Sequence, residues 1–257
     1  MNIHNTAIVH PNAQIDADVT IGPYCIVGEH VVIHSGTVLE SHVFLDGWTE
    51  IGENCHIFPF ASLGTAPQDL KYTGEKTELK IGQGTVIRDS VTAHRGTRGG
   101  GGITLIGDNC LLMAYAHVAH DCHIGNQVIL ANAIAMAGHV TIEDYASVGG
   151  LTAIHQFTKI GRYAYIGGAS AVSKDVPPYA MAAGNRAKLY GVNSIGLQRK
   201  GFSSETIEQI KKAYRRILSS HLNVTQAIAK IEEEIDESPE IRCLVDFIKG
   251  SERGICT

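Results

Sequence analysis

Residues 15–33, IDADVTIGPYCIVGEHVVI, decide the fold, because an aliphatic side chain returns in them at every sixth position. A period of six fits neither an α-helix nor a plain alternating β-strand. It indicates short strands joined by tight turns, in which each unit buries one aliphatic residue on a shared axis. Glycine often follows that residue, as at Gly22 and Gly28, and we expect it to relax the backbone at the corners. The stretch predicts a mainly β fold, a parallel β-helix of hexapeptide repeats.

The period continues from this stretch in both directions. It is unbroken from Ile3 to Leu63, resumes at Ile81 and, after a slip of one residue, runs from Ile106 to Val172. If three hexads make one coil, residues 18 apart lie on the same face of adjacent coils, separated by about 4.8 Å. Because no unit is stable alone, stacking should create one continuous core.

Two segments interrupt the repeat. Residues 65–80, TAPQDLKYTGEKTELK, are polar and skip two expected aliphatic positions, and residues 96–102, GTRGGGG, cause the slip. Loops that project from a rigid solenoid are common places for function. The alternative is an insertion that the fold tolerates. For the glycine-rich loop taken alone we favour that alternative.

The repeat ends at VPPY, residues 176–179, because proline supplies no donor to a strand ladder. Residues 180–201 show no regular pattern, and helical periodicity begins at residue 203. We therefore expect two domains, a β-helix over 1–180 and a helical domain over 181–257. The first helix should bury Ile207, Ile210, Tyr214, Ile217 and Leu218; a second should begin with a capping box of Asn223 and Gln226; a third should begin at Ser238-Pro239 and bury Ile241, Leu244, Val245 and Ile248.

Composition narrows the class of protein. The chain has 257 residues, and its net charge of −5 gives no reason to expect a nucleic-acid partner. The N-terminus lacks the basic and apolar regions of a signal peptide, and no apolar run is long enough for stable membrane insertion. The six cysteines form no C-x-x-C pair, which favours free thiols in a reducing compartment. We expect a cytoplasmic protein.

Residues 114–126, AYAHVAHDCHIGN, hold the strongest candidate for chemistry. His120 is followed directly by Asp121, and a carboxylate fixes the tautomer of an imidazole and favours its charged form. By the 18-residue arithmetic, His120, His139 and His155 should form a column along one face of three coils. Gln156 stands beside the last of them. These residues predict a site for proton transfer, although histidines that merely pack at corners would give the same pattern.

A zinc site is the main chemical alternative. Three histidines form a known catalytic zinc site, and hexapeptide β-helices that resemble γ-class carbonic anhydrases use histidines in this way. However, His117, His120 and His123 are three residues apart, and an odd spacing reverses the side-chain direction within a strand. We therefore favour acid–base chemistry and predict no metal and no other cofactor. A non-catalytic β-helix scaffold remains the alternative outside enzymes.

Seven motifs together resemble one known family. They are AHVAHDCHIGN (116–126), AGHV (137–140), GGLTAIHQF (149–157), QDLKY (68–72), AHRGT (93–97), DVPPY (175–179) and GVNSIGLQRKGFS (191–203). Over essentially the whole chain the sequence resembles the UDP-N-acetylglucosamine 3-O-acyltransferases of the LpxA type. That resemblance implies a left-handed β-helix and a cytosolic homotrimer with active sites between subunits.

The resemblance also implies a reaction and its catalytic residues. Members transfer an (R)-3-hydroxyacyl group from acyl carrier protein to the 3-hydroxyl of UDP-N-acetylglucosamine, the first step of lipid A biosynthesis. His120 would be the general base, Asp121 would orient it, and the Gly138 N–H would receive the charge that develops on the thioester oxygen. Transfer to a 3-amino UDP-sugar, and another hexapeptide-repeat acyltransferase activity, remain alternatives.

Further substrate-binding residues follow from the resemblance alone. Asp69 and Lys71 would hold the sugar, and glycine at position 168, where the family measures acyl length, predicts a longer chain. A basic patch of Lys211, Lys212, Arg215 and Arg216 on the first helix after the repeat would dock the acidic carrier protein; the alternative for each of the four is a solvated helix face. The remaining implied residues are Gln68, His94, His117, His139, His155, Gln156, Arg186, Asn193, Arg199 and Lys200. Three positions depart from the family pattern: Ile195 replaces a glutamate, Lys200 an arginine and Arg186 a histidine.

Overall fold

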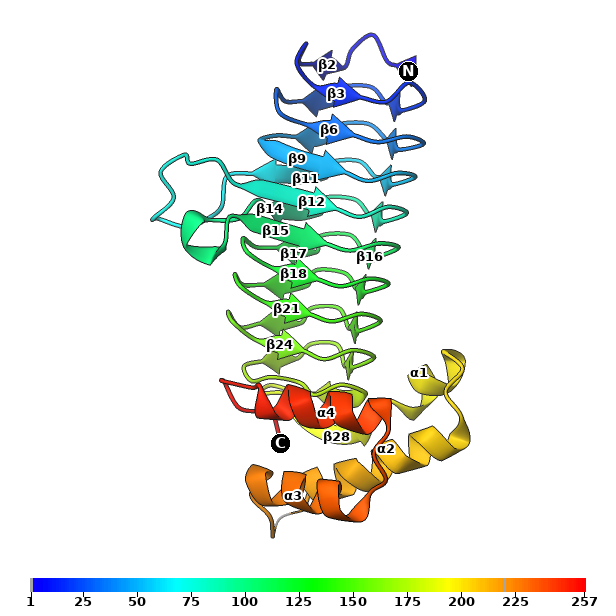
Figure 1. The fold of residues 1–257 in the computed structure, drawn as a ribbon. Helices are drawn as coiled ribbons and strands as arrows, with labels where there is room; N and C mark the ends of the chain where they lie inside the picture. Colours follow the sequence, from blue (N-terminus) through cyan, green and yellow to red (C-terminus); the bar gives the residue numbers. More distant parts are fainter. Residues whose placement is uncertain (1, 220) are drawn as a thin grey trace.

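The computed structural model describes residues 2–219 and 221–257 and consists of a tall β-helix with helices packed at its C-terminal end (Figure 1). The strands are short and form three sheets. Sheet 1 contains β1 (Asn2–Ile3), β4 (Thr20–Ile21), β7 (Val38–Leu39), β10 (His56–Ile57), β13 (Val86–Ile87), β16 (Leu111–Leu112), β19 (Ile129–Leu130), β22 (Ser147–Val148), β25 (Tyr165–Ile166), β27 (Ala180–Ala183) and β28 (Lys188–Val192). Sheet 2 contains β2 (Ile8–Val9), β5 (Ile26–Val27), β8 (Phe44–Leu45), β11 (Ser62–Thr65), β14 (Thr92–His94), β17 (His117–Val118), β20 (Ala135–Met136), β23 (Ala153–Ile154) and β26 (Ala171–Val172). Sheet 3 contains β3 (Gln14–Ile15), β6 (Val32–Ile33), β9 (Trp48–Ile51), β12 (Glu78–Ile81), β15 (Ile103–Ile106), β18 (His123–Ile124), β21 (Thr141–Ile142) and β24 (Lys159–Ile160).

The register confirms that three hexads make one coil. Ile3 pairs with Ile21, and Ala135 pairs with Ala153, in both cases 18 residues further along. The chain visits sheets 1, 2 and 3 in turn, so each coil has three corners. We call the turns that lead from sheet 2 to sheet 3 corner 2–3; residues 119–122, 137–140 and 155–158 are three of them.

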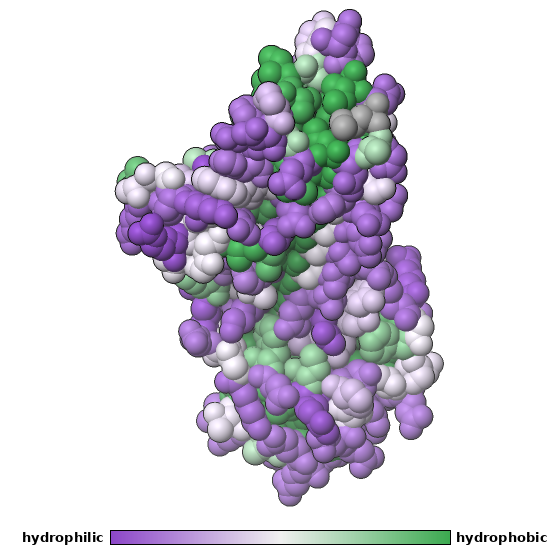
Figure 2. Space-filling view, turned by 45° about the horizontal axis from the view of Figure 1, so that its top comes forward, coloured by the Kyte–Doolittle hydropathy of each residue, from purple (hydrophilic) through white to green (hydrophobic). Residues whose placement is uncertain are grey.

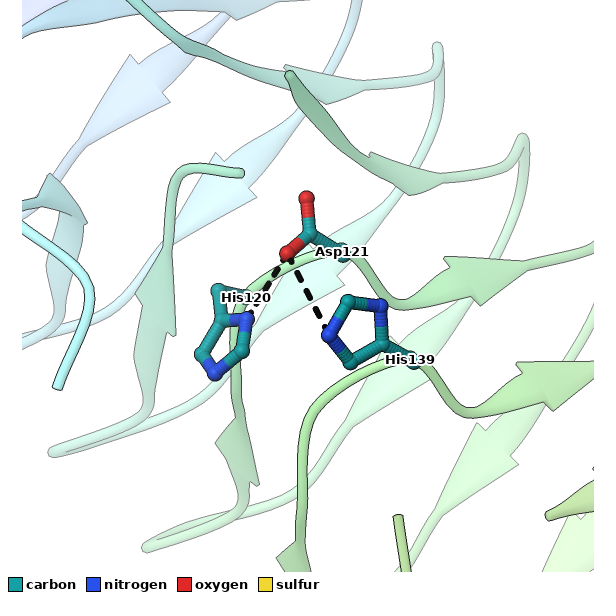
Figure 3. A group of neighbouring side chains, drawn as sticks. All are labelled: His120, Asp121 and His139. Atoms are coloured by element: carbon teal, nitrogen blue, oxygen red, sulfur yellow. Dashed lines mark hydrogen bonds and ion pairs between the residues drawn. The ribbon is translucent and has the colours of Figure 1, made fainter. Parts of the chain in front are cut away.

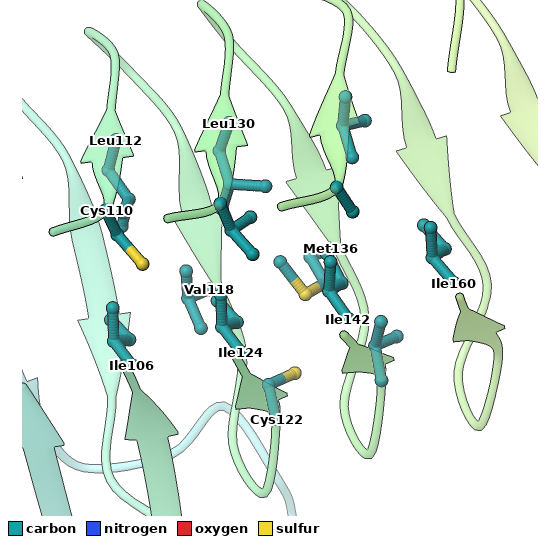
Figure 4. Packing of buried hydrophobic residues seen from close by; sticks show 14 of the residues in the cluster. Ile106, Cys110, Leu112, Val118, Cys122, Ile124, Leu130, Met136, Ile142 and Ile160 are labelled. Atoms are coloured by element: carbon teal, nitrogen blue, oxygen red, sulfur yellow. The ribbon is translucent and has the colours of Figure 1, made fainter. Parts of the chain in front are cut away.

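The core runs along the axis of the β-helix, as the period of six predicts. The repeating aliphatic side chains, such as Leu112, Leu130 and Ile142, are buried and stack coil upon coil (Figure 4). All six cysteines are free thiols, which confirms that prediction, and Cys110 and Cys122 lie in this stack. At the N-terminal end the first described coil has a neighbouring coil on one side only, so the repeat residue Ile3 is 39% exposed and apolar surface gathers there (Figure 2).

The glycines of the repeat have a different role from the one expected. The corner residues with positive φ are mostly not glycine, as at Tyr24 and Phe60. Gly22 and Gly107 have no positive φ, but a Cβ added to either would lie 2.6 Å from the backbone of the next coil. Glycine is needed here because neighbouring coils approach closely, so the prediction that it relaxes these corners is wrong.

Both interruptions of the repeat leave the β-helix at corner 2–3. The long loop runs between β11 and β12, and the glycine-rich loop, which contains the short 3-10 helix η1 (Arg98–Gly100), runs between β14 and β15. Thr65 pairs with His94 where the loops begin, and Glu78 pairs with Ile103 where they end. The two loops therefore project side by side, one coil apart (Figure 1).

The segment after the repeat is more regular than its sequence indicates. Residues 180–201 contain β27 and β28, which pair antiparallel and continue sheet 1, and the helix α1 (Ser194–Arg199). The absence of any periodicity is explained by the short length of these elements. Because sheet 1 continues past residue 180, the division into domains at 180/181 stays a prediction.

The three predicted C-terminal helices are present as α2 (Ser204–Ile217), α3 (Val224–Glu234) and α4 (Pro239–Lys249). The capping box of Asn223 and Gln226 and the N-cap Ser238 are confirmed. Leu218 is the exception, since it caps the end of α2 and is 41% exposed. Ser220, at the end of the predicted first helical segment, lies outside the described residues. In the part of the chain that the structure describes, no helix has the length and apolarity needed to cross a membrane.

Candidate active site

His120 and Asp121 lie together at corner 2–3, directly below the two loops. His120 Nδ1 is 2.8 Å from Asp121 Oδ2 (Figure 3). Because a carboxylate only accepts, the His120 Nδ1–H is the donor, which leaves Nε2 as the basic nitrogen. Figure 3 shows this nitrogen pointing away from Asp121. The Asp121 side chain has no exposed surface, whereas that of His120 is 15% exposed. The pair therefore offers a proton acceptor to solvent and keeps its orienting group buried.

Asp121 is held by a residue that the sequence patterns did not single out. The Thr97 backbone N–H donates to Asp121 Oδ1 at 2.8 Å, and the Thr97 hydroxyl donates to Oδ2 at 2.6 Å. The Asp121 N–H in turn donates to the Thr104 hydroxyl at 2.8 Å. Thr97 belongs to the AHRGT motif and to the glycine-rich loop, but neither gave it a role, and we expected the loop to be a tolerated insertion. These contacts contradict that expectation.

Gly138 lies one coil below His120 in the same column. A Cβ at this position would be 2.6 Å from His120 Cε1, so only glycine lets the imidazole lie against the backbone. The neighbouring His139 N–H donates to the His120 carbonyl at 3.1 Å, and the Gly138 carbonyl accepts from Phe157. Among the described residues the Gly138 N–H has no acceptor. A free backbone donor thus stands beside the imidazole.

The three stacked histidines share corner 2–3 but do not form one column. The 18-residue register places His120 above Gly138 and Gln156, and it places Asp121 above His139. The rings of His120 and His139 meet edge to face at 5.2 Å, and His139 Nε2 is 3.8 Å from Asp121 Oδ2. His155 is exposed and its Nδ1–H donates to the Gln156 carbonyl. The prediction of a single histidine column is wrong, because His120, His139 and His155 occupy different places in their hexads.

His94 and His117 form a second imidazole pair on sheet 2, above the catalytic candidates. Their rings meet edge to face at 5.0 Å, and His117 Nδ1 is 2.7 Å from the Thr92 hydroxyl. Burial, reinforced by repulsion from His117, lowers the pKa of His94 to about 4. Burial also lowers the pKa of His117, with a further contribution from His120. At neutral pH both rings are therefore uncharged hydrogen-bonding groups.

The QDLKY motif occupies the exposed part of the long loop. Gln68 and Lys71 are exposed, and Asp69 Oδ1 accepts from the Lys71 N–H at 2.9 Å, which makes a tight turn. The loop is tied to the β-helix by Arg95, whose buried guanidinium donates to the Tyr72 hydroxyl at 2.9 Å. The motif thus projects polar side chains from an anchored base, and Figure 2 shows this projection as mainly hydrophilic.

The zinc alternative finds no support in the three histidines that suggested it. His117 and His123 lie in β17 and β18, on either side of the corner, and His123 is exposed. Within the described residues the one group with metal-ligand spacing is His120, Asp121 and His139, whose ligand atoms lie within 4.8 Å of one another. The Asp121 oxygens, however, already accept three hydrogen bonds.

Comparison with known proteins identifies the family. The family described as "Udp N-acetylglucosamine O-acyltransferase; Domain 2" matches residues 175–256, and the bacterial transferase hexapeptide family (six repeats) matches residues 1–35 and 103–132. The acyl-[acyl-carrier-protein]–UDP-N-acetylglucosamine O-acyltransferase of Thermodesulfovibrio yellowstonii is 56% identical over 254 residues, which cover 99% of this chain and 98% of that protein. The chain belongs to this O-acyltransferase family.

Solved structures of the family superpose closely on this one. LpxA from Acinetobacter baumannii matches with a TM-score of 0.96 at 50% identity, covering 99% of each chain. LpxA from Bacteroides fragilis, a UDP-N-acetylglucosamine acyltransferase, matches with a TM-score of 0.96 at 42% identity, covering 99% of this chain and 100% of that one. The predicted family resemblance and the left-handed parallel β-helix with a C-terminal helical region are confirmed.

The remaining residues implied by the O-acyltransferase family lie away from corner 2–3. Gly168 is in the turn from sheet 1 to sheet 2, and the exposed Arg186 is in the turn between β27 and β28. Lys200 lies beside the turns from sheet 3 to sheet 1, where its ammonium donates to Gln127 at 3.1 Å. Asn193 caps α1 through the Gly196 N–H, and Arg199 is exposed at the end of α1. One chain therefore does not bring these residues to His120.

Proposed function

We propose that this protein transfers an (R)-3-hydroxyacyl chain from acyl carrier protein to the 3-hydroxyl of UDP-N-acetylglucosamine, the first step of lipid A biosynthesis. Membership of the O-acyltransferase family and the relative named for that donor and acceptor support the reaction. The observation that carries the mechanism is the His120–Asp121 pair, with Nε2 free and the unpaired Gly138 N–H beside the ring.

In the proposed step His120 Nε2 removes the proton of the sugar 3-hydroxyl while the oxygen attacks the thioester carbonyl carbon. The negative charge that forms on the carbonyl oxygen is stabilised by the Gly138 N–H. The carbon–sulfur bond then breaks, and the departing thiolate takes the proton back from His120. Asp121 stabilises the imidazolium without accepting its proton. The new ester forms directly, so the step needs no acyl-enzyme and no metal.

The neighbouring polar groups suit a neutral sugar held beside the base. Because His117 is uncharged at neutral pH and half-buried, it offers a hydrogen bond to a hydroxyl or amide group without attracting a proton from the reacting centre, whereas the buried His94 packs against it. We assign Gln68, Asp69 and Lys71 to the sugar nucleotide as well. His139, His155 and Gln156 continue the same corner downward and would line the path of the acyl and diphosphate groups.

We infer that the working enzyme is a cytoplasmic homotrimer with its sites between subunits. His120, Gly168 and Lys200 lie at three different corners of one chain, so a site that contains all three requires more than one copy. Arg186, Asn193 and Arg199 would then reach the site of a neighbouring copy. On α2, Lys212 and its ion-paired neighbours Arg215 and Arg216 offer a basic surface to an acidic carrier protein.

A transfer assay read by mass spectrometry tests the proposal. The purified protein is incubated with UDP-N-acetylglucosamine, its 3-amino analogue and a series of (R)-3-hydroxyacyl carrier proteins of increasing chain length. An acylated UDP-N-acetylglucosamine is expected, and its mass reports the chain length. If only the 3-amino analogue is acylated, the acceptor is the 3-amino sugar and not UDP-N-acetylglucosamine. If no product forms with any carrier protein, the proposed function is contradicted.

A further inference from the structure

The glycine-rich loop, residues 96–102, donates two hydrogen bonds to the Asp121 carboxylate. Thr97 bonds both oxygens of the carboxylate, with its backbone N–H on Oδ1 and its hydroxyl on Oδ2. Thr97 is itself 6% exposed, so it cannot reach a ligand in solution. The loop closes around it, because the Gly100 and Gly102 N–H groups both donate to the Thr97 carbonyl, at 3.0 and 2.8 Å.

Gly100 restricts the orientation of the Asp121 carboxylate from another side. A Cβ built on Gly100 would lie 2.0 Å from Asp121 Cγ, which means that the loop backbone packs directly against the carboxylate. The adjacent Gly99 differs, since nothing lies within 4 Å of its added Cβ. Both residues belong to η1, and neither has a positive φ, so alanine suits the backbone at both. Gly99 and Gly100 therefore differ only in the contact that Gly100 makes with Asp121.

We propose that the glycine-rich loop is the positioning element of the catalytic pair: Thr97 holds the Asp121 carboxylate by two hydrogen bonds, and Gly100 leaves it one orientation. The inference rests on the proposed function, in which His120 is the general base. Thr97 and Gly100 touch no reacting atom and act only through Asp121.

The physical reason is that a carboxylate is free to turn about its terminal bond unless donors fix it. In the observed orientation Oδ2 accepts from both Thr97 and His120, so the tautomer of His120 depends on where Thr97 holds that oxygen. A turned carboxylate would lose the His120 Nδ1–H and allow the ring to rotate. Substrate binding should not change, because Thr97 is buried and Gly100 packs against the carboxylate rather than against the free side of the His120 ring.

The matched pair Gly100→Ala and Gly99→Ala tests the packing contact. Gly100→Ala should lower kcat between about tenfold and a hundredfold, because small misplacements of catalytic groups have effects of that size. The KM values for both substrates should stay within about twofold of the wild type, as should kcat for Gly99→Ala. Equal activity of the two variants would overturn the role of Gly100.

A double-mutant cycle tests Thr97 separately. Thr97→Val removes the hydroxyl but keeps the shape and the backbone donor, and it should lower kcat roughly tenfold, whereas Thr97→Ser should retain activity. In an Asp121→Ala background, Thr97→Val should cause no further loss. The same fractional loss in both backgrounds would show that Thr97 acts on folding rather than through Asp121. Thr37→Val, which removes an equally buried hydroxyl far from the site, is the stability control.

A spectroscopic measurement separates this inference from the proposed function. In protein labelled with ¹⁵N-histidine, the His120 Nδ1–H should give a hydrogen-bonded resonance that is lost or shifted in Gly100→Ala and kept in Gly99→Ala. An unchanged resonance in Gly100→Ala would contradict the positioning role even for an active enzyme. Conversely, a wild type that transfers no acyl group would refute the function but would leave the resonance as a test of the loop.

Discussion

The two segments that interrupt the repeat share a corner but present opposite surfaces to it. The long loop, residues 65–80, carries exposed polar side chains and the fully exposed Leu70. The glycine-rich loop, residues 96–102, turns Thr97 inward and packs its backbone against Asp121. An exposed loop is suited to bind a ligand, whereas a buried loop acts by placing hydrogen-bond donors and filling space. The first should affect KM and the second kcat.

Contacts between the loops limit how far they act separately. Arg95, which precedes the glycine-rich loop, bonds Tyr72 of the long loop, and the Arg98 N–H approaches Glu75 Oε1 at 3.4 Å. Hydrogen bonds from the Thr73 backbone are the main cause that lowers the pKa of Glu75 to about 2, so this carboxylate remains an acceptor throughout the working range of pH. A change at these contacts should affect both KM and kcat.

The largest effect is expected for the group that the buried loop serves. His120→Ala should lower kcat by a factor of about 10² to 10⁴, because it removes the general base, while the oligomer persists. Steady-state transfer assays and size-exclusion chromatography measure the two properties. Activity close to that of the wild type would show that corner 2–3 is not the catalytic centre, and the two loops would then have no common site to serve.

A smaller effect is expected on stability, through His94, which pairs with Thr65 where the two loops begin. The pKa of His94 lies near 4 in the folded protein and near 6.5 in an unfolded chain. Between these values the unfolded state binds more protons, so the free energy of unfolding should fall as pH falls from 6.5 to 4, by up to about 3 kcal/mol. Urea unfolding at pH 7 and pH 4.5, at one protein concentration, measures it.

The matched variant for this experiment is His94→Gln, which carries no titrating group. Its free energy of unfolding should depend less on pH across the same window than that of the wild type. Identical pH dependence of the two proteins would show that other groups, such as His117, dominate the loss of stability.

A third prediction concerns the exposed loop. Lys71→Met should raise KM for the UDP-sugar about tenfold with little change in kcat, because one charge-assisted contact contributes on the order of 1.5 kcal/mol. Lys76→Met, in the same loop but outside the QDLKY motif, is the control and should leave KM unchanged. A fall in kcat without a change in KM would contradict the assignment of substrate binding to the long loop and of catalytic positioning to the glycine-rich loop.

The smallest effect on rate is expected away from both loops. A Cβ at Gly168 would lie 3.1 Å from the Gly150 carbonyl oxygen, and the glycine is exposed, so a larger side chain would project into the space outside the turn. Gly168→Met should therefore shift the preferred donor to a shorter acyl chain while the rate with that donor is preserved. Competition between carrier proteins of different chain length measures the shift, and an unchanged profile would exclude Gly168 from measuring length.

Sequence reasoning found the catalytic pair and missed the loop residues that hold it in place. His120 and Asp121 were recognisable because proton-transfer chemistry needs those side chains next to each other. The role of the Gly138 N–H was predicted only by the family resemblance. Thr97 and Gly100 carry no chemical signature, and their contact with Asp121 spans 24 and 21 residues rather than the 18 of the regular coil. The extra residues of the loop change that spacing, so the repeat does not predict the partner.

The β-helix, its core and the helices at its end were predictable from the sequence, because the periods of six and of 3.6 residues show which aliphatic side chains are buried together. Three features became visible only in the folded structure: both loops begin at one corner, the repeat glycines allow close packing between coils, and Thr97 holds Asp121. The physical reason is that periodicity determines which side of a strand faces the core, whereas contacts at a corner depend on the length and path of the inserted loops.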